Sequence, residues 1–176
     1  MISDLYDTSN RPLWGLKSEI DFLNHGSFGA SPKAVLERQN ALREIMEMDP
    51  VEFIENLGVG LWEEALNQLS DFVNADPAGM AFVPNATTGV NTVLASLKLD
   101  AGDKILVTDT TYQACRNAVD AVAERSGCEV NVASIPVPLD DEEYAVEAVL
   151  DAVEDRTRLA LIDTISSPTG IRMPFE

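Results

Sequence analysis

Residues 104–134 read KILVTDTTYQACRNAVDAVAERSGCEVNVAS, and they contain two strand-like runs separated by a helical pattern. Its first run, KILVTD, is short and mostly apolar, as expected of a strand. Residues 112–126 follow, where Cys115, Val119 and Val122 recur at the spacing of one helix face, and the second run, CEVNVAS, again predicts a strand. Two strands joined by a helix of this length lie parallel, because only a long crossover returns the chain to the same edge of a sheet.

The same alternation extends in both directions along the chain. MAFVP at 80–84 predicts a strand and residues 86–97 a helix, while residues 141–153 predict a helix and RLALIDTI a buried strand. Two amphipathic helices come first, one from Pro32 to the Asp49-Pro50 break with Ser31 as its N-cap, and one over about 60–74. The sequence therefore predicts an α/β fold in which N-terminal helices precede a mainly parallel sheet covered on both faces.

Composition narrows the class of protein. The 176 residues are 45% hydrophobic, enough for one sizeable core, and carry a net charge of −18. Such an acidic chain is a poor match for nucleic acid or an anionic membrane, since both are bound through clustered Lys and Arg. Cys115 and Cys128 are too few for a disulfide framework or a zinc site of paired cysteines, and no signal peptide or membrane span is evident. We therefore expect a cytoplasmic protein without a metal ion.

Three loops follow the predicted strands, at 84–88, 109–113 and 164–170. In parallel sheets, ligands bind beyond the carboxyl ends of the strands, so these loops are where a site is expected. The first, NATTG, opens a helix, where free N–H groups and the helix dipole favour an anion and two threonines add hydroxyls. The alternative is that Asn85 or Thr87 only caps the helix. The glycine patterns of dinucleotide and nucleoside-triphosphate loops are absent from it.

The other two loops carry weaker signals. Tyr112 begins a predicted helix, where its ring is suited either to stacking on a flat ligand or to ordinary packing. SSPTG, residues 166–170, offers hydroxyls in a segment that Pro168 and Gly170 bend into a turn, and a purely structural turn explains it equally well. His25, the only histidine, is by itself more typical of a structural hydrogen bond than of catalysis.

Taken in order, FLNHGSFG, NATTGVN and SSPTG resemble the class V aminotransferase family, whose members use pyridoxal 5′-phosphate (PLP) on a fold type I scaffold. The likeness spans about residues 20–176 and is greatest to the isopenicillin N epimerase-like branch. It implies that Ala86 and Thr87 bind the cofactor phosphate through their backbone and Thr87 or Thr88 through a hydroxyl. It further implies that the Tyr112 ring stacks on the pyridine ring and that Ser167 hydrogen-bonds the phenolic oxygen.

The resemblance also divides the chain. It implies an N-terminal segment, 1–30, whose Asn24, His25 and Gly26 lie on the substrate side, and an incomplete PLP-binding large domain over 31–176. The aspartate that holds the pyridine nitrogen and the Schiff-base lysine are expected beyond Glu176, so this chain is predicted to supply no catalytic residue and to be inactive alone. Asp163 ends a strand as such an aspartate would, but in the family that residue lies on the next strand.

The predicted function is therefore the N-terminal part of a PLP-dependent enzyme, a homodimer when full length, acting on an amino acid or related amine. Epimerase, carbon–sulfur lyase and transferase reactions share their first half, so the resemblance leaves all three open. Two other classes remain as alternatives: a Rossmann-like nucleotide-binding oxidoreductase domain, and a scaffold with the PLP fold but no chemistry. The long helical segment before any strand favours the PLP fold, since a Rossmann domain usually opens with its nucleotide-binding strand.

Overall fold

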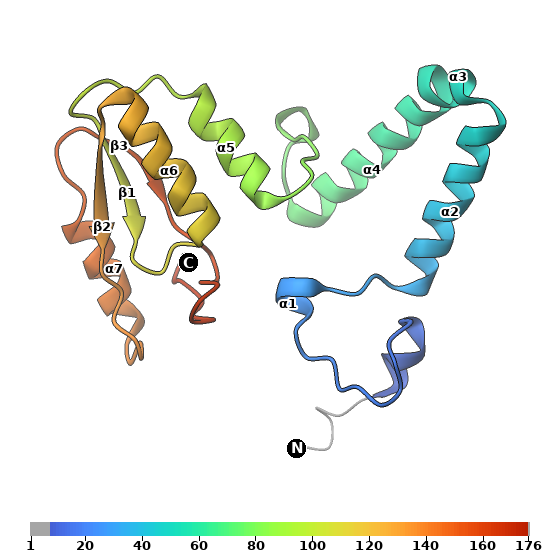
Figure 1. Ribbon diagram of the computed structural model, residues 1–176, viewed down its shortest axis with the longest axis horizontal. Coiled ribbons are helices and arrows are strands. Elements are labelled where there is room, and N and C mark those ends of the chain that lie inside the picture. The colour runs from blue at the N-terminus through green and yellow to red at the C-terminus, as the bar shows by residue number, and fades with distance from the viewer. Residues whose placement is uncertain (1–7, 176) are drawn as a thin grey trace. The chain divides into compact units, whose positions relative to one another are not determined.

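The computed structural model describes residues 8–175, and the chain divides into two compact units, Met1–Ala81 and Phe82–Glu176 (Figure 1). The boundary between the units falls inside the predicted strand at 80–84. The predicted division into 1–30 and 31–176 rests on the family resemblance and stays a prediction.

The described part of the first unit is helical. Its elements are η2 (Thr8–Leu13), α1 (His25–Phe28), α2 (Lys33–Met48), α3 (Pro50–Glu52), the π-helix η3 (Phe53–Leu57), α4 (Gly58–Val73) and η4 (Pro77–Gly79). Both predicted N-terminal helices are confirmed as α2 and α4. The N-cap of α2 is Pro32 and not Ser31, because Pro32 is extended and forms a β-bridge with Trp14.

The second unit is a parallel sheet with its connecting helices. In chain order it contains α5 (Ala86–Ser96), β1 (Lys104–Thr108), α6 (Gln113–Ser126), β2 (Glu129–Ala133), α7 (Glu142–Asp151) and β3 (Thr157–Leu161). The strand order is β2-β1-β3, with β1 parallel to both neighbours (Figure 1). Lys104 pairs with Glu129 and Thr108 with Ala133, so β1 and β2 end at the same level. We call this end of the three strands the carboxyl edge. The predicted α/β fold is confirmed.

One predicted strand is wrong. Residues 80–83 form no strand in the described part of the chain. Phe82 and Val83 keep 39% and 46% of their surface exposed. An apolar pattern becomes a strand only when another strand supplies its backbone partners. Within residues 8–175 no strand pairs with this segment.

The core of the second unit lies on two sides of the sheet. Ile105 and Val107 point from β1 to one face, where they pack with Leu94 of α5 and Val119 of α6. Ala145 of α7 packs in a second cluster with Ile135 and Met173, because α7 covers the other face. Right-handed crossovers require this, since β1 to β2 and β2 to β3 step in opposite directions across the sheet. None of the helices described in residues 8–175 is long and apolar enough to cross a membrane.

Candidate functional site

The amino end of α5 has backbone N–H groups that have no hydrogen-bond partner within residues 8–175. Asn85 is extended and caps the helix, its Oδ1 accepting hydrogen bonds from the Thr88 N–H at 2.8 Å and the Thr88 hydroxyl at 3.1 Å. The N–H groups of Ala86 and Thr87 belong to the first turn, where no earlier turn offers them a carbonyl. Asn85 therefore caps the helix, as one of the two interpretations of this loop expects. The N–H groups of Ala86 and Thr87 remain beside it at the positive end of the helix.

The Thr87 side chain lies near the Cys115 thiol in the first turn of α6, close enough to lower the pKa of that thiol. Helices α5 and α6 pack together, so the NATTG loop lies at the same edge as Tyr112. The Thr88 hydroxyl already donates to Asn85 and would have to rotate to donate to a ligand. The backbone donors of Ala86 and Thr87 need no rearrangement.

The loop after β1 is held by hydroxyl groups. Thr108, Thr110 and Thr111 are buried, with Thr108 Oγ1 lying 3.1 Å from the hydroxyl of each of the other two. The Thr111 hydroxyl also accepts the Thr108 N–H at 3.0 Å. This cluster closes a tight turn that leads into α6, whose N-cap is Tyr112. The Tyr112 side chain is 46% exposed, so its ring lies at the surface of this edge.

The loop after β3 contacts the loop after β1 at two points. Asp163 Oδ2 accepts the Tyr112 N–H at 2.8 Å, and the buried Ser166 donates its hydroxyl to the Thr110 carbonyl at 3.3 Å. Residues 166–170 form the predicted turn, closed by the Gly170 N–H on the Ser166 carbonyl at 2.7 Å. Ser167 is exposed beside these contacts. The structure therefore brings the three predicted loops together at the carboxyl edge.

Sequence patterns did not single out the pairing of Asp163 with Tyr112, or Cys115 as a neighbour of Thr87. Cys115 is buried in the first turn of α6. Burial raises the pKa of the Cys115 thiol above its ordinary value, the Asp163 carboxylate raises it further, and the nearby Thr87 side chain opposes both. The thiol is therefore kept protonated, as suits a packing residue, and a thiolate nucleophile is not favoured here.

The predicted substrate-side residues lie in the other unit. Asn24 precedes the four-residue helix α1, which begins with His25 and Gly26, and all three residues are exposed. The His25 ring stands edge-on to Phe22 at 4.8 Å and lies 6.1 Å from the Trp14 ring. These contacts place His25 in a small aromatic group within its own unit.

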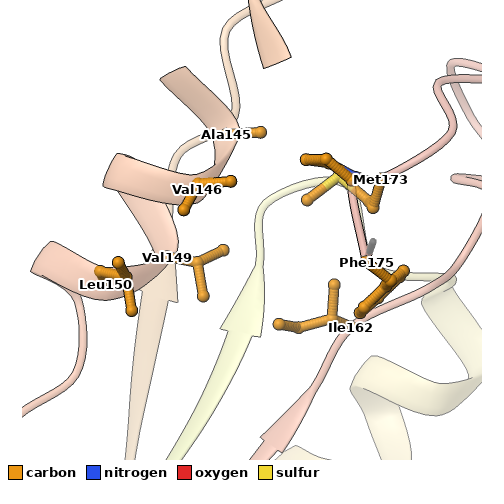
Figure 2. Close-up of a pocket in the computed structure, with 8 residues that line it drawn as sticks. Ala145, Val146, Val149, Leu150, Ile162, Met173 and Phe175 are labelled. Atoms are coloured by element: carbon orange, nitrogen blue, oxygen red, sulfur yellow. The ribbon is translucent and has the colours of Figure 1, made fainter. Parts of the chain in front are cut away.

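The second unit also contains a hollow whose lining side chains are all apolar. It measures about 220 Å³ and lies between α7 and the segment after β3, with Val146, Val149, Ile162 and Phe175 among its lining residues (Figure 2). No side chain in this group can bind a phosphate or move a proton. Across residues 8–175, no cluster of His, Cys, Asp and Glu is suited to hold a metal ion. The carboxyl edge is thus the candidate site.

Comparison with known proteins gives a consistent picture. The sequence model of the family described as Aminotransferase class-V matches residues 32–176. The chain is 33% identical over 153 residues to isopenicillin N epimerase of Streptomyces clavuligerus, covering 86% of this chain and 38% of that protein. It is 30% identical to L-cysteine desulfhydrase of Arabidopsis thaliana, covering 86% of this chain and 37% of that one. The chain thus spans about two-fifths of the length of the curated relatives it matches.

Solved structures agree with the fold. A C-DES mutant with glycine covalently linked to its PLP cofactor superposes with a TM-score of 0.81 at 25% identity, covering 93% of this chain and 43% of that one. The cystine C–S lyase C-DES in complex with cysteine persulfide gives a TM-score of 0.80 at 26% identity, over 89% and 42% of the two chains. The cysteine desulfurase CsdA from Escherichia coli, at 20% identity and a TM-score of 0.74, shares the fold.

Proposed function

This chain belongs to the class V aminotransferase family. We therefore propose that it is part of a PLP-dependent enzyme that acts on an amino acid or related amine. Relatives named as an epimerase, a desulfhydrase and a C–S lyase support a reaction at the α-carbon or the adjacent carbon–sulfur bond. When bound, PLP supplies an electron sink for the bond that breaks at the α-carbon. The family match gives no support to the alternative of a nucleotide-binding oxidoreductase domain.

The observation that carries this proposal is the pair of backbone donors at the start of α5. The N–H groups of Ala86 and Thr87 lie at the positive end of an 11-residue helix, which is the donor set that a phosphate monoester requires. Asn85 already satisfies the Thr88 N–H, so it aligns the turn without occupying these donors. The residues present therefore fit the phosphate of PLP. The Thr87 hydroxyl, or the Thr88 hydroxyl once it rotates away from Asn85, adds a further donor.

The remaining loops would hold the rest of the cofactor. The exposed Tyr112 ring provides a flat apolar face at the same edge. Ser167, exposed on the neighbouring turn, offers a hydroxyl to the phenolic oxygen. Asn24, His25 and Gly26 are proposed to bind the substrate, and the family resemblance is their support.

None of the four lysines is proposed to bind the cofactor aldehyde. Lys104 lies at the opposite end of β1 from the carboxyl edge and forms ion pairs with Glu154 and Glu129. Lys98 follows the far end of α5, and a helix of 11 residues separates its two ends by roughly 16 Å. Lys17 and Lys33 do not follow a strand of the sheet, as the Schiff-base lysine of the family does. On this proposal the chain alone does not catalyse the reaction. The family likeness also supports a homodimer and a cytoplasmic location.

The proposal is tested by measuring the affinity of the full chain for PLP by titration calorimetry. Substituting Thr87→Val and Thr88→Val together should weaken binding about tenfold, because a hydrogen bond to a charged phosphate contributes about 1.5 to 3 kcal/mol. Thr92→Val is the matched control, since the Thr92 hydroxyl only donates to the Thr88 carbonyl one turn further along α5. The proposal also requires inorganic phosphate to compete with PLP. No binding of PLP by the unmodified chain would show that the proposed function is wrong.

A further inference from the structure

Asp163 is the residue that connects the end of β3 to the start of α6. Its Oδ2 accepts the Tyr112 N–H at 2.8 Å, across 51 residues of sequence. Asp163 forms no ion pair with any Lys or Arg among the described residues. Among these residues its one hydrogen bond is to the Tyr112 backbone.

The bonded N–H has an unusual place at the helix start. A helix-capping side chain normally accepts an N–H of the first turn, inside the helix. The N–H that Asp163 accepts belongs instead to Tyr112, the N-cap residue, and so fixes the direction from which the chain enters α6. Three residues later along the chain, the Ser166 hydroxyl holds the Thr110 carbonyl. The backbone on the approach to the Tyr112 ring is thus held at two points by the loop after β3.

The Tyr112 ring has little else to orient it. Its side chain is 46% exposed, and among the described residues no ring stacks on it and no hydrogen bond involves its hydroxyl. The backbone at Tyr112 sets the direction of its Cα–Cβ bond and the staggered rotamers that are open to the ring. The contact between Asp163 and the Tyr112 N–H fixes that backbone on the side that precedes α6, while the Tyr112 carbonyl accepts the Cys115 and Arg116 N–H groups inside the helix.

Building on the proposed function, we propose that Asp163 is a positioning residue: its carboxylate holds the Tyr112 backbone so that the ring faces the aromatic ring of the cofactor. Asp163 itself does not contact the ligand. Its effect on binding is transmitted through Tyr112, so removing the Tyr112 ring must remove the effect of Asp163.

A double-mutant cycle on PLP affinity tests this dependence. In the full chain, Asp163→Ala should weaken PLP binding about fivefold, while Asp163→Asn, which keeps an oxygen acceptor, should stay within about twofold. In a Tyr112→Ala background, Asp163→Ala should cause no further loss. Equal losses in both backgrounds would overturn the proposal, as would Asn losing as much affinity as Ala.

A second readout needs no cofactor. Hydrogen exchange of the Tyr112 amide should accelerate in Asp163→Ala and stay slow in Asp163→Asn. Unchanged exchange in the alanine variant overturns the positioning role. Asp141→Ala is the matched control, because Asp141 caps α7 by accepting the Glu143 N–H and contacts none of the three loops. It should lower stability without changing PLP affinity. If the unmodified chain binds PLP but the cycle shows no coupling, only the role of Asp163 is wrong, whereas absent binding overturns the proposed function itself.

Discussion

Tyr112 combines an exposed ring with a fixed backbone, and the two can be separated by substitution. Tyr112→Phe keeps the ring and should retain most of the affinity for PLP. Tyr112→Ala loses the contact area and aromatic pairing, which should lower the binding free energy by about 1 kcal/mol or more. Calorimetric titration of both variants decides between stacking and simple packing. If the alanine variant binds PLP as tightly as the unmodified chain, the ring has no role in the site.

Cys115 makes the stability of the second unit depend on alkaline pH. Its folded-state pKa is raised above the ordinary value of 9.0, first by burial and then by Asp163. A raised pKa means that the contribution to stability is complete below about pH 9 and is lost as pH rises through the folded value. The free energy of unfolding in urea should therefore fall as pH rises above about 9. In Cys115→Ala the fall should be shallower, although the variant is less stable throughout; an equal slope would contradict the raised pKa.

For single residues, the sequence predicted which positions lie at the carboxyl edge but not which contacts fix them there. NATTG, Tyr112 and SSPTG could be placed at one edge because the ends of parallel strands meet there. The partners of these residues could not be found, since Thr87 with Cys115 and Tyr112 with Asp163 are joined only by the packing of separate elements. Local periodicity indicates which face of a helix is buried, and long-range pairs depend on register between elements.

Elements were predicted well wherever the pattern and its partner both lie in the second unit. β1 and β2 fall within the predicted runs, β3 begins one residue before its predicted run and ends four residues before the end of that run, and α5 and α6 begin and end within one residue of the expected positions. Residues 80–84 differ from these elements. Their apolar pattern resembles that of β1, but β1 is bonded on both sides, whereas no described strand lies beside 80–84. A strand is defined by its neighbours as much as by its own residues.

At the end of the sheet opposite the carboxyl edge, a charged residue joins β1 to β3. Asp103 is 2% exposed; it accepts the Asp100 N–H at 2.9 Å and bonds from Arg156 and Arg158 at 3.0 and 3.3 Å. These contacts connect the start of β1 to the start of β3, where the register shifts between Lys104 and Ile105. Asp103 is thus a structural contact, far from the candidate site.

Acid should weaken this contact in a defined direction. The Asp100 N–H, followed by the two arginines, holds the pKa of Asp103 below its ordinary value of 3.8. Stability from a lowered pKa is present above the ordinary value and is lost as pH falls through the folded value. Asp103→Asn should be less stable at pH 7 and lose stability less steeply below about pH 4. Asp100→Asn, which keeps the bonded N–H, is the control and should retain the slope of the unmodified chain.

Across the whole molecule, burial is divided unevenly between the units. Every hydrophobic side chain that is buried among the described residues belongs to the second unit, from Leu94 to Met173. In the first unit, α2 and α4 are amphipathic as predicted, yet Trp62 is 53% exposed and Phe72 is 87% exposed. The sequence predicted the apolar faces of these helices correctly, because the periodicity is local. It could not show what covers them, because that depends on contacts outside the helix.

Uneven burial predicts uneven protection in hydrogen exchange of the full chain. An amide exchanges when its hydrogen bond opens, and the free energy of opening rises with the apolar contacts that must be broken with it. In β1, Ile105, Leu106 and Val107 are fully buried between helices on both faces, so these amides should open only with global unfolding of the second unit. Helix α4, with Ser70 as its one buried residue, should open locally and exchange much faster. Mass-spectrometric exchange at neutral pH should therefore show α2 and α4 fully deuterated while β1 and α6 remain protected. Added PLP should slow exchange at the start of α5 without protecting β1 further. Equal protection of α4 and β1 would mean that the two units unfold together.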